Sequence, residues 1–449
     1  MSIFSSEQPA EIARPRRGTE IGSVGPINGN SLARVPLALM LAVIGIYGVI
    51  SYASFQRAEL ATSPVFGTST GQVSWLVTRS GSVLRSQALL LALRAFYAGG
   101  DTKRMRLILL TLVSFSLASA APCITANQSC AEWVSLGTAP ARSLIYRTYS
   151  LETRNEAITR ALVVVHGAGR DADNYFRNAL AAAFLAGALD NTVVVAPRMA
   201  SAAANCHDTL APNEISWNCN SWRSGGPAIS NPDVTSFDFL DEILRKVARK
   251  EIFPNLKQIV VTGHSAGGQV LNRYEMANQV HDKLGVPITY VVANPSSYAW
   301  PDGTRPTDAA YSLQSHAPGY IPLVSADAAA FRSFGGARDC TTYDQWPYGL
   351  KDRTGYAAKQ TDEQLKTQLT SRPTTYLLGE LDVLPLGGFD GSCSAMAQGP
   401  TRLARGEAFG KFVNEKLGAH HVVKIVPECG HNARCMFTSE DALPLLFPK

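Results

Sequence analysis

The first 122 residues of this 449-residue chain contain no cysteine, although the chain as a whole has eight. An even number of cysteines confined to residues 123–449 favours a set of disulfide bonds formed in an oxidising compartment. Charged residues are also scarce, at 17%, whereas hydrophobic residues make up 46%. This composition excludes a disordered chain, a collagen and a coiled coil, and for most of the length it excludes a polytopic membrane protein.

The larger part of the chain, residues 123–449, carries no excess of positive charge. Residues 1–122 hold 11 lysines and arginines against 5 acidic residues, whereas residues 123–449 hold 30 against 31. The net charge of +5 therefore comes from the N-terminal segment. The remainder lacks the basic surface typical of nucleic-acid-binding proteins, so we expect no nucleic-acid partner.

Residues 105–120 have the pattern of a secretion signal. Basic residues at 103–106 precede an apolar run at 107–117, and Ala-Ser-Ala at 118–120 matches a small-x-small cleavage sequence. The alternative is an internal transmembrane or core helix, but the run is shorter than the ~20 residues of a membrane span. We therefore predict cleavage after Ala120 and a secreted or periplasmic domain of residues 121–449.

Residues 35–55 are 21 uncharged and mostly apolar residues, long enough to span a bilayer. The sequence at 41–52, followed by Gln-Arg at 56–57, resembles the permease subunit of macrolide-exporter-type ABC transporters, and the likeness covers roughly residues 30–95. Such a fragment transports nothing by itself. We interpret residues 1–104 as a non-functional remnant, a fusion scar or an over-extended start. The alternatives are an anchor that holds the downstream domain outside the membrane, or a membrane-anchored transport component.

The rest of the chain alternates apolar, β-branched runs with amphipathic segments. The predicted strands are 161–165, 192–195, 258–262, 288–293, 375–378 and 422–426. The clearest predicted helices are 237–250 and 269–284. Continuous apolar strands that alternate with helices indicate an α/β fold with a doubly wound, mostly parallel sheet. Residues 301–373, rich in Pro, Gly, Ser and aromatics, are predicted to form a loop-rich cap insertion over the carboxyl edge of the sheet.

The clearest chemical motif is Gly-His-Ser-Ala-Gly-Gly at 263–268, directly after the predicted strand 258–262 and before a helical pattern. A G-x-S-x-G sequence alone is a weak signal, because it occurs by chance. In a strand–turn–helix context it predicts a nucleophile elbow, in which a strained Ser265 presents its hydroxyl at the N-terminus of a helix. The positive end of the helix dipole stabilises negative charge that develops there. The alternative is an ordinary glycine-rich turn.

A second glycine-rich turn, His-Gly-Ala-Gly at 166–169, ends the predicted strand 161–165. Backbone amides in such a turn can stabilise the oxyanion of a tetrahedral intermediate. We expect the donors to be the amides of Ala266 and of Ala168 or Gly167. His166 is expected to orient the turn rather than to transfer protons.

A serine nucleophile needs a base and an acid, which here are predicted to follow it in the chain. Asp382 lies just beyond the strand 375–378, with Glu380 as the second choice for the acid and Asp390 as a weaker one. His431 follows the last predicted strand, and from that position it can take the proton of the serine while the carboxylate fixes its tautomer.

These motifs, in this order and strand context, resemble the α/β-hydrolase superfamily over roughly residues 140–449. The resemblance implies a Ser265–Asp382–His431 triad and hydrolysis through an acyl-enzyme, without a cofactor. The chain departs from the lipase pattern in having His-Gly-Ala-Gly where lipases have His-Gly-Gly-Gly, which leaves the identity of the second oxyanion donor open.

Cys429 and Cys435 bracket His431, and a disulfide bond between them would hold the histidine loop. The competing interpretation is a zinc site made by these three residues, but zinc requires a fourth ligand or a defined open position. Cys206 with Cys219, and Cys123 with Cys130, are candidate local pairs, which would leave Cys340 for Cys393. Spacing alone does not determine the connectivity.

Aromatic residues are frequent in the predicted loops at the carboxyl edge. We select Tyr175, Trp217, Trp222 and Trp346 as candidate substrate-binding residues, because aromatic rings in loops bind acyl chains, phenolic rings or sugars. The alternative is that they only pack the loops beneath a cap.

The sequence therefore favours a secreted serine carboxylester hydrolase. Secreted, disulfide-braced hydrolases of this kind resemble feruloyl esterases and polyester depolymerases. No polymer-binding module follows the predicted domain, so we expect small or oligomeric esters as substrates. A serine peptidase or amidase on the same triad is the alternative enzyme, and a non-catalytic ligand-binding protein of the same fold is the alternative outside enzymes.

Overall fold

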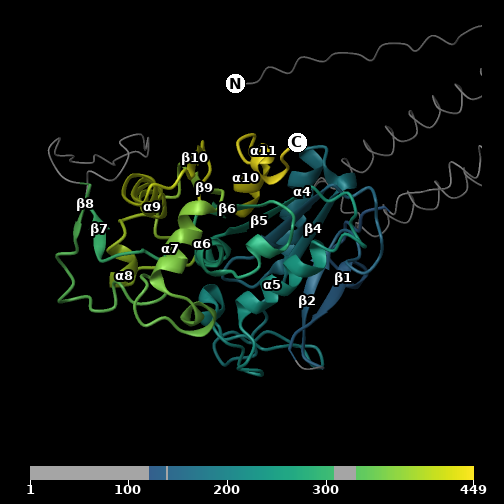
Figure 1. The fold of residues 1–449 in the computed structure, drawn as a ribbon, viewed down its shortest axis with the longest axis horizontal. Helices are drawn as coiled ribbons and strands as arrows, with labels where there is room; N and C mark the ends of the chain where they lie inside the picture. Colours follow the sequence, from purple (N-terminus) through teal and green to yellow (C-terminus); the bar gives the residue numbers. More distant parts are fainter. Residues whose placement is uncertain (1–120, 138–139, 308–329) are drawn as a thin grey trace, which may run out of the picture. The chain divides into compact units, whose positions relative to one another are not determined.

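The computed structural model describes residues 121–137, 140–307 and 330–449 (Figure 1). The chain divides into two units, residues 1–116 and 117–449, and all of the described residues belong to the second. The predicted signal at 105–120, the permease-like segment at 30–95 and the predicted span at 35–55 lie outside the described residues. Within those that are described, no helix is long and apolar enough to cross a membrane.

The main sheet has eight strands in the order β1-β2-β4-β3-β5-β6-β9-β10. Their bounds are β1 Ala131–Ser135, β2 Arg142–Arg147, β3 Arg160–Val165, β4 Thr192–Pro197, β5 Gln258–His264, β6 Ile288–Ala293, β9 Thr374–Gly379 and β10 Val422–Val426. In this sheet β3, β4, β5, β6, β9 and β10 pair in parallel with one another, whereas β1 and β2 are antiparallel to their neighbours. Figure 1 shows β1 and β2 at one end of the sheet and β9 and β10 at the other. The predicted doubly wound, mostly parallel sheet is confirmed.

Helices cover both faces of the sheet. The α-helices are α4 Ala172–Leu185, α5 Ser236–Val247, α6 Ala266–Ala277, α7 Asp362–Ser371, α8 Cys393–Met396, α9 Arg402–Leu417, α10 Ala433–Thr438 and α11 Leu443–Leu446. The 3-10 helices are η1 Gln128–Cys130, η2 Leu189–Asn191, η3 Ser221–Ser224, η4 His281–Lys283 and η6 Gly355–Lys359. Helices α5, α6, α7 and α9 pack against one face, and α4, α10 and α11 pack against the other.

The central strands are apolar throughout because both of their faces are buried. In β3, Ala161, Val163 and Val165 belong to the core beneath α5 and α6, whereas Leu162 and Val164 belong to the core beneath α4 and α10. Successive side chains of a strand point to opposite faces, so a strand covered twice shows no polar alternation. This is the physical origin of the continuous apolar runs in the sequence.

Two predicted helices have different ends in the structure. Helix α5 begins at Ser236 because Thr235 and Asp238 form a capping box, and it ends at Val247 rather than at residue 250. Helix α6 begins at Ala266 and ends at Ala277, where Asn278 leaves the helical conformation. The helix predicted over 269–284 is therefore wrong in its second half, which contains the separate η4.

The predicted insertion, residues 301–373, is described except for residues 308–329. Strands β7 Thr304–Pro306 and β8 Phe331–Ser333 form a small antiparallel pair, and η6 follows. The last part of the insertion is helix α7, which contacts α6 and α9 and contributes Leu365 and Leu369 to the core. The loop-rich part therefore ends before α7.

All eight cysteines form disulfide bonds. The pairs are Cys123–Cys130, Cys206–Cys219, Cys340–Cys393 and Cys429–Cys435. These are the pairings considered in the sequence analysis. The bond between Cys429 and Cys435 leaves no thiolate for a zinc ion beside His431, so the zinc interpretation is wrong.

Candidate active site

Ser265 occupies a strained turn between β5 and α6. Its backbone has φ 61° and ψ −118°, a region that residues with a side chain rarely adopt. The neighbouring glycines make the turn possible. A Cβ atom on Gly267 would lie 2.2 Å from the carbonyl oxygen of Val165, and one on Gly263 would lie 2.5 Å from the oxygen of Gly267. Close backbone packing therefore fixes Ser265 at the carboxyl end of β5.

Ser265, His431 and Asp382 form a chain of two hydrogen bonds. The Nε2 atom of His431 lies 2.9 Å from the Oγ atom of Ser265, and its Nδ1 atom lies 2.7 Å from Oδ2 of Asp382. A carboxylate only accepts hydrogen bonds, so Nδ1 carries the proton and Nε2 accepts from the serine hydroxyl. Ser265 is 7% exposed and Asp382 is 2% exposed. The structure thus brings the three predicted residues together in the order that proton transfer from serine requires.

The other two candidate acids lie elsewhere. Glu380 accepts a hydrogen bond from the backbone amide of Glu428, at 3.0 Å. Asp390 accepts from the hydroxyl of Tyr348, at 2.9 Å. Asp382 is the carboxylate that His431 contacts.

Arg402, at the start of α9, holds Asp382 from the side opposite His431. Its Nη1 atom lies 3.2 Å from Oδ1 of Asp382, and its Nε atom donates to Ser296 Oγ at 2.6 Å. Its Nη2 atom donates to the carbonyl oxygens of Leu386, at 2.7 Å, and Gly387, at 3.0 Å. Burial lowers the pKa of Arg402 from its usual value, and the charge of Asp382 opposes this shift. Arg402 was missed in the sequence analysis, because no local motif links it to Asp382.

His264 was also missed, although it directly precedes Ser265. Its ring centroid lies 4.6 Å from that of His431, and its Nδ1 atom lies 3.2 Å from the hydroxyl of Tyr175. Burial lowers the pKa of His264 well below its usual value, and the nearby His431 and Arg402 lower it further. His264 is therefore neutral at physiological pH, so it does not repel a positive charge that develops on His431.

His166 orients the turn at 166–169 through both ring nitrogens. Burial lowers the pKa of His166 to about 4, so the ring is neutral. Its Nε2 atom accepts from the amide of Met199 at 3.0 Å, which leaves the proton on Nδ1 to donate to the carbonyl of Gly167 at 2.8 Å. Trp222 packs against the ring, with 4.9 Å between centroids.

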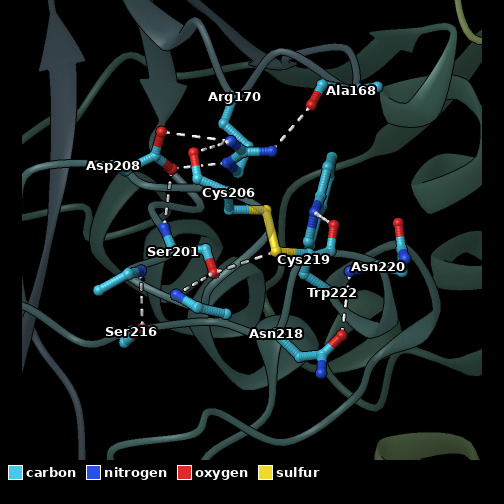
Figure 2. The surroundings of a disulfide bond; sticks show 12 residues. Ala168, Arg170, Ser201, Cys206, Asp208, Ser216, Asn218, Cys219, Asn220 and Trp222 are labelled. Carbon is cyan, nitrogen blue, oxygen red and sulfur yellow. Dashed lines mark hydrogen bonds and ion pairs between the residues drawn. A yellow bond between two sulfur atoms is a disulfide. The ribbon is translucent and has the colours of Figure 1, made fainter.

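Arg170 directly follows this turn, and its side chain is hydrogen-bonded to it (Figure 2). Its guanidinium group donates to the carbonyl oxygens of Ala168, at 3.1 Å, and Cys206, at 3.2 Å. It also pairs with Asp208, whose Oδ2 atom lies 2.6 Å from Nε. Figure 2 shows this cluster beside the Cys206–Cys219 disulfide bond. A crosslinked loop therefore fixes the direction of a peptide group in the glycine-rich turn.

A cavity of about 530 Å³ lies over Ser265 and His431. One wall consists of the turn at 167–169 and the N-terminal half of α4, including Tyr175. The other consists of Gly387, Gly388 and residues 432–434. Most of the side chains in these walls carry polar groups, so the cavity suits a substrate that forms hydrogen bonds.

The aromatic residues selected from the sequence have different positions. Tyr175 lines the cavity. Trp217 and Trp222 are fully buried in the core, so their prediction as substrate-binding residues is wrong. Trp217 stacks on Phe239, and the Nε1 atom of Trp222 donates to the carbonyl of Cys219 at 3.0 Å. Trp346 packs against the core and donates to the carbonyl of Ser224 at 3.1 Å, outside the cavity that contains Ser265.

Within the described ranges, no group of three or more histidine, cysteine, aspartate or glutamate residues is arranged to hold a metal ion. The site as described consists of protein groups suited to acyl transfer: a hydroxyl, an imidazole, a carboxylate and backbone amides.

Fold and site together define a hydrolase of the doubly wound α/β class. A model of the alpha/beta hydrolase family matches residues 162–443, and the chain belongs to this family. No curated protein sequence matches the chain significantly.

Several solved structures are similar to the chain at low scores. The poly(3-hydroxybutyrate) depolymerase LpqC from Bordetella parapertussis is 20% identical, with coverage of 69% of this chain and 85% of that one and a TM-score of 0.46. Poly(aspartic acid) hydrolase-1 from Sphingomonas sp. KT-1 is 22% identical, with coverage of 68% and 95% and a TM-score of 0.46. An esterase from Pyrobaculum calidifontis is 15% identical, with coverage of 70% and 82% and a TM-score of 0.34. These values are too low to transfer a substrate to this chain.

Proposed function

We propose that the protein is a serine hydrolase that cleaves carboxylic esters through an acyl-enzyme. The observation that carries this proposal is the hydrogen-bonded chain from Ser265 through His431 to Asp382, at a strained turn that opens into a polar cavity. The membership in the alpha/beta hydrolase family is consistent with it.

In the first half of the reaction, the Oγ atom of Ser265 attacks the ester carbonyl while Nε2 of His431 takes the serine proton. Asp382 stabilises the resulting imidazolium through its hydrogen bond to Nδ1. The tetrahedral intermediate collapses when His431 gives its proton to the leaving alcohol. Water then attacks the acyl-serine with His431 as the base, and the acid and free Ser265 are released.

The oxyanion of both intermediates is stabilised by backbone amides. Ala266 is the first residue of α6, so its amide has no carbonyl partner within the helix. The carbonyl of Gly167 accepts from His166 Nδ1 and from the amide of Arg170, at 2.8 and 3.2 Å. Since the two groups of a trans peptide point in opposite directions, the amide of Ala168 points away from these donors. The amide of Gly167 instead lies close to the Tyr175 hydroxyl and lowers the pKa of Tyr175 against the larger, opposite effect of burial. We therefore favour Ala168 over Gly167 as the second donor.

The test compares the full-length protein with its Ser265→Ala variant on nitrophenyl esters from acetate to palmitate. We expect kcat to fall ~10³-fold or more in the variant. A fluorophosphonate probe should label the parent and not the variant. Equal, near-background rates for both proteins would contradict the ester-hydrolase proposal, and peptide and amide substrates would then distinguish a peptidase from a non-catalytic binding protein.

We also propose that the protein acts outside the cytoplasm. Four disulfide bonds within the described residues support an oxidising compartment. Mass spectrometry of the N-terminus of the protein recovered from its native cells tests this proposal. A start at Ala121 is expected, whereas a start upstream of residue 35 would indicate a retained anchor.

A further inference from the structure

Helix α4 presents a polar face to the cavity over Ser265. Asp171, which precedes the helix, and Asn174, Tyr175 and Asn178 all line this cavity. Their spacing of three, four and seven residues places them on one side of a helix. The apolar residues of α4, among them Phe176, are buried against the sheet instead.

Asn178 differs from the rest of this face in its hydrogen bonding. Asn174 donates to Asp171 at 3.1 Å, and the hydroxyl of Tyr175 is bonded to His264 at 3.2 Å. Asn178 is only 5% exposed, yet its carboxamide makes no hydrogen bond to any residue that the structure describes. The nitrogen and oxygen of its carboxamide are not among the fully buried, unpaired polar atoms of the described residues, so they keep accessible surface on the cavity. A carboxamide that lines a substrate cavity and has no protein partner is available to a ligand.

We propose that Asn178 determines specificity by forming a hydrogen bond with a hydroxyl group of the substrate. The preferred substrate is then an ester with a free hydroxyl group on the part that lies along α4. This inference rests on the proposed ester hydrolysis. A carboxamide offers both a donor and an acceptor, and a hydroxyl group does the same, so the two groups are complementary. Asp171 lines the same wall and disfavours a carboxylate beside α4 by charge repulsion, whereas Arg434 lines the other wall.

Binding at Asn178 should favour a hydroxylated substrate over its plain analogue. When a plain ester binds, it covers the carboxamide of Asn178, removes it from the water of the cavity and offers no partner in exchange. Sites built to bind a substrate hydroxyl discriminate against analogues that lack it for this reason. The preference should therefore appear in kcat/KM and depend on the side chain at position 178.

The experiment measures kcat/KM of the full-length protein on two matched pairs of esters. Ethyl 3-hydroxybutyrate against ethyl butyrate places the hydroxyl on the acyl side, and 2-hydroxypropyl butyrate against propyl butyrate places it on the alcohol side. We expect the wild type to prefer the hydroxylated member of at least one pair by ~10-fold or more. Asn178→Leu should reduce this ratio to near one, mainly by lowering kcat/KM for the hydroxylated ester.

Two further variants make the result specific. Arg177→Leu introduces the same residue on the exposed side of α4, where the arginine pairs with Asp173, and should keep the wild-type ratio. Asn178→Ala provides a smaller side chain in case leucine impairs folding. A wild-type ratio near one in both pairs, with normal turnover of the plain esters, would overturn the inference and leave ester hydrolysis intact. A ratio that survives both Asn178 variants would also overturn it. No turnover of any ester, in wild type and Ser265→Ala alike, would refute the proposed function itself.

Discussion

Arg402 and Asp382 form an ion pair that is almost completely buried, with 3.2 Å between Nη1 and Oδ1 and side-chain exposures of 0% and 1%. The other oxygen of Asp382 is bonded to His431. The carboxylate is thus fixed between a permanent cation and the histidine that it orients. Arg402 also donates to the carbonyls of Leu386 and Gly387, so it ties the loop after Asp382 to the same point.

Arg402→Met should lower both stability and activity. Removing one partner leaves the charge of Asp382 buried and uncompensated, which costs about 3–5 kcal/mol of unfolding free energy. Arg402→Lys keeps the charge but loses the planar fork that reaches several acceptors, so we expect an intermediate effect. Urea unfolding and ester kinetics measure the two effects. A kcat of Arg402→Met within twofold of wild type would show that Asp382 needs no support from this side.

Arg170→Met should lower kcat more than it raises KM. The arginine side chain donates to the carbonyl of Ala168, in the peptide group next to the one that carries the proposed oxyanion amide of Ala168, so without it the turn loses one of its anchors. Loss of one oxyanion donor costs ~10²–10³-fold in kcat, so partial disorder of the turn should cost ~10-fold. Steady-state kinetics on a short-chain nitrophenyl ester measure this, with Arg177→Met on the surface of α4 as the control. Equal kcat for the two variants would argue against the role of Arg170.

Removing either of two disulfide bonds should affect stability and kcat in opposite order. Replacing Cys340 and Cys393 with serine opens a loop with a sequence separation of 53, and replacing Cys429 and Cys435 opens one of 6. Chain entropy predicts losses of about 4 and about 2 kcal/mol respectively. The effect on kcat should be the reverse, with ~10-fold or more lost in the second variant, because its loop carries His431. Thermal unfolding and kinetics on both variants test this crossed pattern, and the same rank order in both measurements would contradict it.

Gly267→Ala should prevent the turn at Ser265 from forming. The added Cβ would lie 2.2 Å from a backbone oxygen of β3, which cannot move without the sheet. We expect a loss of ~3 kcal/mol or more. Gly391→Ala is the matched control, since a Cβ there meets nothing within 4 Å, and its effect should stay within ~0.5 kcal/mol. Chemical denaturation measures the unfolding free energy of both variants, and equal losses would contradict the prediction.

Glu275 should make the stability depend on pH. This residue of α6 is fully buried, and burial raises its pKa from 4.5 to about 8. Between these values the folded chain holds a proton that the unfolded chain releases, so the free energy of unfolding falls as the pH rises. Below pH 4.5 both states are protonated and this contribution does not change. Glu275→Gln is neutral throughout and should show a flatter profile from pH 5 to 8 by denaturant titration. Parallel profiles for the two proteins would contradict the prediction.

The turn at Ser265 could be predicted because its signals lie in one short stretch of the chain. The strand, the glycines and the helical pattern around Ser265 are contiguous, so the turn could be identified without knowing its surroundings. The pairs Asp382–Arg402 and Tyr175–His264 form only in the folded chain, and no local sequence pattern predicts them.

The errors have a similar origin. Trp217 and Trp222 lie in a loop rich in polar residues, where sequence cannot distinguish an aromatic side chain that binds a ligand from one that packs inward. The antiparallel strands β1 and β2 were not predicted. Both contain polar and charged residues, so they lack the continuous apolar run that identifies the central strands.

None of the eight strands of the main sheet contains a cysteine, whereas three of the four crosslinks involve loops around the cavity or the cap. These three bonds therefore constrain the loops that shape the site and leave the strands that carry those loops without a crosslink. Their reduction would act on the geometry of the histidine loop and of the glycine-rich turn rather than on strand pairing.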